Sequence, residues 1–125
     1  MNVVDSSAWL EYFANGANAA FFARPIEQVD ELIVPSLTLY EVFKRVLQQR
    51  GEDDALQAVS LMQQGTVVDL DASIALTAAR LSLELKLPMA DSVILATAKA
   101  FSAALWTQGE DFSGMKGVQF RKRKA

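Results

Sequence analysis

The chain has 125 residues, of which 51% are apolar and 22% are charged, and its formal net charge is −3. This length and balance predict one globular domain. The absence of Cys and His excludes disulfides, thiolate metal sites and the usual general base of hydrolases. Hydrolytic chemistry would have to use carboxylates, Lys, Tyr or Ser/Thr, and clustered carboxylates favour Mg²⁺ or Mn²⁺ over zinc.

The sequence shows no targeting or membrane segment. Its start lacks the basic and apolar regions of a secretory signal, and the longest apolar region, residues 92–106, is interrupted by Lys99 and is too short to span a bilayer. We therefore expect a cytoplasmic protein without membrane contact.

Positive charge is unevenly distributed along this acidic chain. Residues 121–125 form a basic tail that contains Arg121 to Lys124, and Lys44, Arg45 and Arg50 lie along one predicted helix. The net negative charge argues against a general electrostatic attraction to nucleic acid. A basic tail is more often a solvated end than a binding element, but it can contact phosphate.

Short apolar runs alternate with segments of helical periodicity from one end of the chain to the other. In chain order, the expected elements are a strand at 2–5, helices at 8–13 and 18–23, a strand at 31–34, helices at 39–50 and 52–64, a strand at 66–70, helices at 72–85 and 88–103, and strands at 104–107 and 118–120. The two central helices are predicted to form a helical hairpin over residues 37–64.

Capping and turn residues set the expected ends of these elements. Ser6 or Ser7 should cap the first helix, Pro25 should end the second, and Ser36 or Thr38 should cap the third.

The helix over 72–85 has a clear predicted cap in Asp71. Its apolar residues are candidates for the core: Ile74, Leu76, Ala78, Leu81 and Leu85.

Strands alternating with helices imply a parallel sheet with helices on both faces. We expect an α/β fold, a three-layer α/β/α sandwich with a central parallel sheet of four to five strands. In such sheets ligands bind beyond the carboxyl ends of the strands, near the switch in strand order. Asp5 ends the first strand, Thr107 to Asp111 follow the fourth, and the helices of Glu41 and Asp91 begin after a strand and a turn. These side chains can therefore meet at one edge of the sheet.

Asp91 stands at the start of an otherwise apolar helix. Pro88 suits the first helical turn, because the N–H that proline lacks would be unpaired there. Asp91 follows about one turn into the helix, where the helix dipole favours an ionised acid by roughly 0.3–1 kcal/mol. Taken alone, Asp91 is more simply explained as a favourable first-turn residue.

Asp5 and Glu41 also have structural explanations when each is taken alone. Asp5 can cap the helix that follows it, and Glu41 stands three residues after Thr38, which is the spacing of a capping box. Together with Asp91, however, these explanations require three coincidences on one side of one sheet. Like charges brought together are unfavourable unless a divalent cation lies between them. The sequence therefore predicts a metal site formed by Asp5, Glu41 and Asp91.

Four blocks of the sequence carry acidic and hydroxyl residues at the predicted element ends: Val3-Val4-Asp5-Ser6-Ser7, Tyr40-Glu41-Val42, residues 88–98 and residues 105–112. In order and spacing, these blocks resemble the signature blocks of PIN-domain proteins and, among them, the VapC-type toxins of toxin–antitoxin pairs. The resemblance covers nearly the whole chain, and it implies a single PIN domain over residues 1–125.

The resemblance implies a metal-dependent endoribonuclease. The acids of this family hold one or two Mg²⁺ or Mn²⁺ ions, which activate a water for in-line attack on an RNA phosphodiester and leave a 5′-phosphate and a 3′-hydroxyl. This agrees with the composition, because a chain without His or Cys can obtain a nucleophile at neutral pH from metal-bound water.

Individual residues match the family pattern at several positions. Asp5, Glu41 and Asp91 match the first three acids, and Thr107 matches the hydroxyl residue at the end of the fourth strand. Ser6 or its neighbour Ser7 is expected to donate a hydrogen bond to a carboxylate or a phosphate.

The fourth block departs from the family pattern. The family usually has Thr-x-Asp there, whereas this chain has Gly109 in place of the acid, followed by Glu110 and by Asp111, which matches a second, often acidic position. Three interpretations remain open: a site that tolerates the loss, a site that uses Asp111 instead, or an impaired nuclease. An impaired site would make the protein a PIN-fold module that binds RNA or antitoxin without cutting.

The resemblance also implies partners. These are an RNA substrate, a cognate antitoxin that docks on the 37–64 hairpin and inserts an Arg or similar group into the acidic pocket, and a second copy of the chain in a homodimer. Tyr40, Phe43 and Leu47 form one stripe of this hairpin, although packing against the sheet would account for most of them.

A third class of function, a flavodoxin-like signalling domain with Asp5 as a phospho-acceptor, is disfavoured. Such domains need an acidic pair after the first strand and a late Lys, whereas Asp5 is followed by Ser6 and Ser7.

Overall fold

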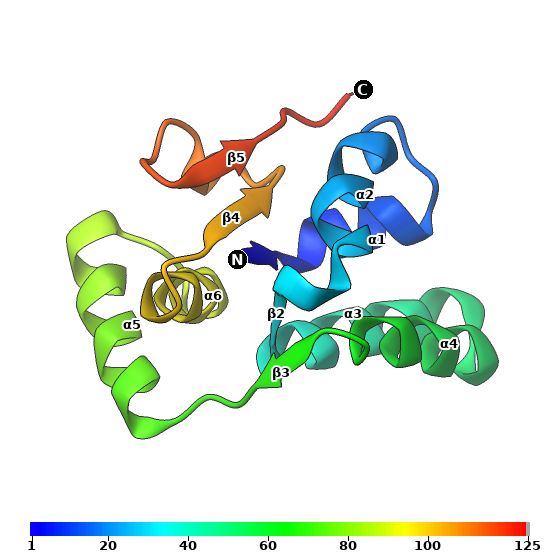
Figure 1. Ribbon diagram of the computed structural model, residues 1–125, viewed down its shortest axis with the longest axis horizontal. Helices are drawn as coiled ribbons and strands as arrows, with labels where there is room; N and C mark the ends of the chain where they lie inside the picture. Colours follow the sequence, from blue (N-terminus) through cyan, green and yellow to red (C-terminus); the bar gives the residue numbers. More distant parts are fainter. Residues whose placement is uncertain (125) are drawn as a thin grey trace.

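A computed structural model describes residues 1–124, which form a five-stranded sheet with helices on both faces (Figure 1). The strands are β1 (Asn2–Val4), β2 (Leu32–Pro35), β3 (Thr66–Val68), β4 (Ala104–Thr107) and β5 (Val118–Phe120). The helices are α1 (Ser6–Phe13), α2 (Ala19–Glu27), α3 (Ser36–Arg50), α4 (Glu52–Met62), α5 (Ala72–Leu85) and α6 (Met89–Ala100), with short 3₁₀ helices η1 (Val29–Glu31) and η2 (Glu110–Phe112). The predicted α/β class and parallel sheet are confirmed.

All neighbouring strands of the sheet run parallel, in the order β3-β2-β1-β4-β5. The chain moves outward from β1 through β2 to β3, and then crosses back to β4 on the other side of β1. The switch in strand order therefore lies between β1 and β4. Val4 is paired with Trp106 in this register, so that the residues after these two strands emerge together. A parallel sheet places its ligand site at such a switch point.

Alternate residues of the central strands enter two separate cores. Val4 and Val34 face the core that contains Trp9 of α1, together with residues of α2, α3 and α4. Val3 and Ile33 face the opposite core, which contains Ile94 of α6 and Phe112 of η2. This alternation follows from the two-residue period of a strand, and it makes the sheet the middle of three layers.

Helix α5 packs on α6 and lies outside the sheet layer, at the left of Figure 1. Its predicted cap is confirmed, since the Asp71 carboxylate accepts a hydrogen bond from the Ile74 N–H at 2.9 Å. Ile74 and Ala78 are buried as expected, but Leu76 and Leu85 are 67% and 42% exposed. The prediction that these two leucines lie in the core is wrong, because α5 buries only the narrow stripe that faces α6.

The predicted helical hairpin is confirmed as α3 and α4, which pack side by side at the lower right of Figure 1. Gly51 joins them with φ at +93°, a backbone conformation that glycine adopts without steric cost. Of the apolar stripe on α3, Phe43 packs against the core, whereas Tyr40 and Leu47 are 58% and 41% exposed.

The predicted caps Ser6 or Ser7 of the first helix and Ser36 or Thr38 of the third are wrong, whereas the alternative that Asp5 caps the first helix is confirmed. Helix α1 begins at Ser6, and its cap is Asp5, whose carboxylate accepts from the Ala8 N–H. Helix α3 begins at Ser36, directly after Pro35, and has no side-chain cap. Thr38 lies inside its first turn, where the buried hydroxyl donates to the Pro35 carbonyl oxygen at 2.6 Å.

Helix α2 also continues past its predicted end. It includes Pro25 and runs to Glu27, although proline cannot donate the next hydrogen bond of the helix. Phe22, Pro25 and Ile26 are buried on one face, and this packing offsets the lost bond.

Other ends differ by a few residues: α4 ends at Met62, α6 at Ala100 and β3 at Val68. Within residues 1–124, no helix has the length and apolar content that crossing a membrane requires.

We expect Phe112→Ala to lower the free energy of unfolding by about 3–5 kcal/mol, because Phe112, in η2 after β4, is fully buried in the core. Urea denaturation would measure the change. The matched control is Phe101→Ala, which removes a ring that is 40% exposed and should cost less than about 1 kcal/mol. Equal losses in the two variants would show that the ring of Phe112 doesn't stabilise the core.

Candidate active site

Asp5 is the most deeply buried acid of the site. It follows β1 and caps α1, and it is only 4% exposed. Its Oδ1 accepts hydrogen bonds from the Ala8 N–H at 3.0 Å and the Ser7 hydroxyl at 2.7 Å, and its Oδ2 accepts from the Thr107 hydroxyl. Burial raises the pKa of Asp5, and these hydrogen bonds oppose that rise only in part.

Thr107 connects Asp5 to the loop after β4. Its hydroxyl donates to Asp5 Oδ2 and accepts from the Gly109 N–H at 2.8 Å. Because β1 and β4 are neighbours in the sheet, the end of β4 places this hydroxyl beside the Asp5 carboxylate. The orientation of Asp5 is therefore fixed from both strands at the switch point.

Glu41 lies on α3 and is held from α1. The Ser6 hydroxyl donates to Glu41 Oε1 at 2.6 Å. The capping-box explanation of Glu41 is wrong, since Thr38 bonds the Pro35 carbonyl oxygen from within the helix. Ser6 and Ser7 thus each donate to one acid of the site, Glu41 and Asp5 respectively.

Asp91 lies in the first turn of α6, which begins at Met89; Pro88 is the N-cap residue and not the first helical residue, so that Asp91 lies one position nearer to the helix start than expected. The pKa of Asp91 is raised to about 6, first by burial and then by the negative charges of Asp5, Asp111 and Glu41. A side-chain hydrogen bond with Asp111 raises it further. The structure therefore brings four acids, from four different elements, within electrostatic reach of one another.

Gly109 occupies the place where the resemblance expects a fourth acid. A Cβ built there would lie 3.3 Å from Thr107 Oγ1 and 3.8 Å from Asp5 Oδ2. Its φ is −77°, which any residue adopts. A side chain at position 109 would therefore begin next to the Asp5 carboxylate, and it would require Thr107 Oγ1 to move by a few tenths of an ångström.

Of the two acids that follow Gly109, the structure brings one to the site. Asp111 lies in η2, and its charge and hydrogen bond act on Asp91. Glu110 is exposed at the start of the same short helix.

The oxygen donors of this site suit a hard divalent cation such as Mg²⁺ or Mn²⁺. Between residues 1 and 124, no three acidic side chains lie close enough to surround one ion together. Side-chain rotation of Glu41 or Asp91 would be needed, whereas Asp5 is fixed by its hydrogen bonds. The repulsion that raises the pKa of Asp91 is the repulsion that a divalent ion would relieve, so the donor chemistry of these residues fits such an ion once Glu41 or Asp91 rotates toward it.

Two amides form a network behind Asp5 that the sequence did not indicate. The Asn18 side-chain NH₂ donates to Gln108 Oε1 at 3.1 Å, and Gln108 donates to the Ser7 carbonyl oxygen at 3.4 Å. Both amides are buried. Since Asn18 and Gln108 are 90 residues apart in the sequence, no local pattern marks them as partners.

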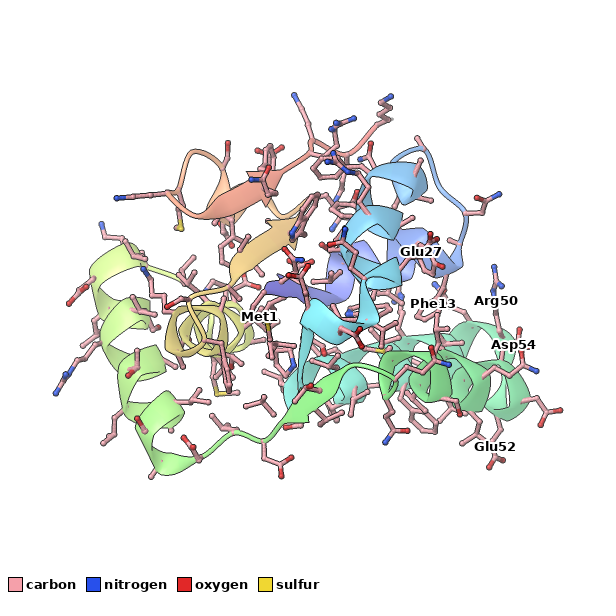
Figure 2. The ribbon with its side chains drawn as sticks, in the orientation of Figure 1. Met1, Phe13, Glu27, Arg50, Glu52 and Asp54 are labelled. Carbon is pink, nitrogen blue, oxygen red and sulfur yellow. The ribbon has the colours of Figure 1, made fainter. Side chains whose placement is uncertain are left out.

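A groove of about 870 Å³ runs along α1, α3 and α4, and of the four acids of the site Glu41 lines it. Ser6, Glu41 and Gln108 lie at the end beside the acids. Figure 2 shows three other lining residues, Phe13, Arg50 and Asp54, on the same side of the molecule. The groove has apolar walls and charged side chains of both signs: Leu10, Phe13, Ala14, Val46, Ala58 and Leu61, with Glu11, Glu41, Asp54, Arg45, Arg50 and Arg123.

Several solved structures are similar to this chain over nearly its whole length. A toxin–antitoxin complex from Klebsiella pneumoniae contains a chain that is 25% identical, with a TM-score of 0.78 and coverage of 95% of this chain and 96% of that chain. VapC20 of Mycobacterium tuberculosis, a toxin that cleaves the sarcin–ricin loop, is 18% identical, with a TM-score of 0.76 and coverage of 95% and 99%. A chain of DNA-bound VapBC from Salmonella typhimurium is 16% identical, with a TM-score of 0.74 and coverage of 97% and 96%.

No curated protein matches the chain in sequence. The family comparison is decisive, because residues 3–118 match the PIN domain. This match covers all five strands and all six helices of residues 1–124 in whole or in part. The chain belongs to the PIN domain family, and its structural neighbours are VapC toxins of toxin–antitoxin complexes.

Proposed function

We propose that this protein is a metal-dependent endoribonuclease of the VapC type, which cleaves RNA phosphodiesters and is inhibited by a cognate antitoxin. The observation that carries the proposal is the electrostatic coupling of four acids. The charges of Asp5, Glu41 and Asp111 all act on Asp91, at the switch point of a parallel sheet. A chain without His or Cys has to base such hydrolytic chemistry on other groups, and carboxylates are suited to it.

Each acid has a distinct role in this proposal. Asp5, held by Ser7 and Thr107, is the fixed ligand of Mg²⁺ or Mn²⁺, and Glu41 and Asp91 complete the ligand set. A bound divalent ion supplies a water of lowered pKa and stabilises charge on the phosphate. Ser6 orients Glu41 through its hydrogen bond.

Asp111 takes over part of the role of the acid that is missing at position 109. It comes from the same loop and interacts with Asp91 through both charge and a hydrogen bond.

An antitoxin is the partner that the structural neighbours suggest, since several of them are toxin–antitoxin complexes. The groove along α1, α3 and α4 would receive an antitoxin segment, because apolar walls such as Leu10 and Leu61 are combined with charged residues. An Arg of that segment could then reach Glu41 at the end of the groove. The homodimer and the cytoplasmic location remain predictions.

A second candidate function is a PIN-fold module that binds RNA or antitoxin without catalysis. Gly109 favours it, because a side chain at this position would begin 3.8 Å from Asp5 Oδ2 and the chain has no acid there. Metal-linked stabilisation without RNA cleavage would support this second function.

We expect Asp91→Asn to reduce Mg²⁺- or Mn²⁺-dependent cleavage of RNA by at least about a hundredfold, because it removes a proposed metal ligand. Cleavage of a labelled RNA would be measured with and without EDTA. The matched control is Asp30→Asn in η1, before β2 and thus at the opposite edge of the sheet, which should retain full activity. Equal activity in the two variants would refute the proposed site.

Gly109→Asp should increase metal-dependent cleavage by about tenfold or more, because it adds an oxygen ligand beside Asp5. Gly109→Asn is the matched control, as it has nearly the same shape without the charge. Initial rates of RNA cleavage at a fixed Mn²⁺ concentration would be compared. If all three proteins cleave at the same rate, the glycine does not limit the site.

Without metal, the protein should become less stable as the pH rises from about 4 to about 6. In this window the folded state retains the proton of Asp91, whose pKa is raised from 3.8 to about 6, while the unfolded state has released it. The contribution of Asp91 to the free energy of unfolding is therefore fully present below pH 3.8 and is lost as the pH rises through about 6. The raised pKa of Asp5 acts in the same direction.

Thermal melting in EDTA across this pH range would measure the effect. Asp91→Asn should show a smaller decrease in melting temperature than the unmodified protein, because only the contribution of Asp5 remains. A decrease of the same size in both would contradict the assignment to Asp91.

A further inference from the structure

The basic tail is anchored to the domain just before Arg123. The Arg121 N–H donates to the Thr107 carbonyl oxygen at 3.0 Å, and the Asn18 side chain donates to the Lys122 carbonyl oxygen at 2.9 Å. The Arg121 guanidinium carbon lies 4.2 Å from the centre of the Phe21 ring, in the range of a cation–π contact. Figure 1 shows this end of the chain beside α2. The tail is therefore held against the fold through Lys122.

This anchoring places Arg123 at the acidic end of the groove. Arg123 lines the groove together with Ser6, Ser7, Glu41 and Gln108. Its positive charge also lowers the pKa of Asp5, against the larger effect of burial. A cation of the tail is thus located next to the proposed metal ligands.

Two further arginines, Arg45 and Arg50, line the same groove from α3, and Arg45 is the nearer of the two to Glu41 along the helix. Arg45 follows Glu41 by one helical turn and lines the groove with it. Acidic residues line the groove as well, but the Glu11 carboxylate accepts a hydrogen bond from the Asn18 N–H at 2.8 Å. Arg45 on the helix and Arg123 on the tail are both exposed and available to a ligand.

An RNA strand has to approach four carboxylates on a chain whose net charge is −3. Each phosphate adds a negative charge, so the approach becomes more favourable when fixed cations of the protein lie beside the acids, in addition to any divalent ion that the acids hold. Arginine is well suited to this task, because its planar guanidinium can donate two hydrogen bonds to one phosphate.

We propose that Arg123 and Arg45 bind backbone phosphates of an RNA strand that lies in the groove, on one side of the bond to be cut, and that Asn18 positions Arg123 by holding the tail. This inference rests on the proposed ribonuclease function and specifies how the substrate is bound.

The test measures binding of a labelled single-stranded RNA by fluorescence anisotropy at several salt concentrations in Mg²⁺. The Asp91→Asn background prevents cleavage during the measurement. We expect Arg123→Ala to weaken binding about five- to tenfold, and to lower the slope of log K against log salt by about 0.7, as expected for one lost phosphate contact. Arg45→Ala should act similarly.

Matched controls remove the same charge from neighbouring positions outside the groove lining. They are Lys124→Ala for Arg123 and Lys44→Ala for Arg45; the Lys44 ammonium lies over the Tyr40 ring, 5.6 Å from its centre. Each control should weaken binding by less than about twofold. Arg123→Lys should keep the salt dependence of the unmodified tail, because it retains the charge. Its affinity for RNA should lie between those of Arg123 and Arg123→Ala, because lysine cannot donate two parallel hydrogen bonds to one phosphate.

A double-mutant cycle tests the role of Asn18. Asn18→Ala should weaken RNA binding, while Asn18→Ala combined with Arg123→Ala should bind no more weakly than Arg123→Ala alone. A thermal melt of each variant verifies folding. Additive losses would show that Asn18 does not act through Arg123.

The proposal is overturned if Arg123→Ala and Lys124→Ala weaken binding equally, since the tail would then act only as diffuse charge. The ribonuclease function would survive that result, because the unmodified protein would still cleave RNA. If the unmodified protein neither binds nor cleaves RNA in Mg²⁺ or Mn²⁺, the proposed function and this inference both fail.

Discussion

The site depends on the repulsion between carboxylates that the fold brings to one edge of its sheet. Asp5 can be buried there because hydrogen bonds reach both of its oxygens, from the start of α1 on one side and from Thr107 on the other. For Asp91, burial and the neighbouring negative charges are not offset in this way, and the pKa of its carboxyl group is therefore raised. The strand order creates this situation, because the switch between β1 and β4 places residues 5 and 107 next to each other. A divalent ion would convert the repulsion into binding energy.

The parts of the fold that the sequence predicted well are those fixed by local patterns. The strand at 104–107 and the cap at Asp71 agree with the structure, because short apolar runs and capping residues act over a few positions. The errors arise where the structure of a segment depends on packing against residues that are distant in the sequence. Pro25 stays within a helix because its neighbours are buried, and Leu76 is exposed because α5 buries only the face that carries Ile74 and Ala78.

The same distinction applies to the site. The proximity of Asp5, Glu41 and Asp91 could be predicted because each lies at the start of a helix or within its first two turns, and parallel strands bring such helix starts together. The hydrogen bond from Ser6 to Glu41 spans 35 residues, and that from Asn18 to Gln108 spans 90. A sequence shows that such side chains can donate hydrogen bonds, but it doesn't show to which partner. The capping-box interpretation of Glu41 failed for this reason: the spacing fitted, but the glutamate accepts from another helix.

Gly109 and Arg123 change the charge around Asp5 in the same direction. A side chain at position 109 would begin 3.8 Å from Asp5 Oδ2, so an acid there would add to the repulsion that already raises the pKa of Asp91. With glycine at position 109 this negative charge is absent, and Arg123 adds a positive charge that lowers the pKa of Asp5. Both features favour the ionised form of the remaining acids without metal, and both reduce the negative potential that attracts a cation. The missing fourth acid and the anchored tail therefore have the same electrostatic effect. Both weaken the attraction of the site for a cation, and both reduce its repulsion of a phosphate.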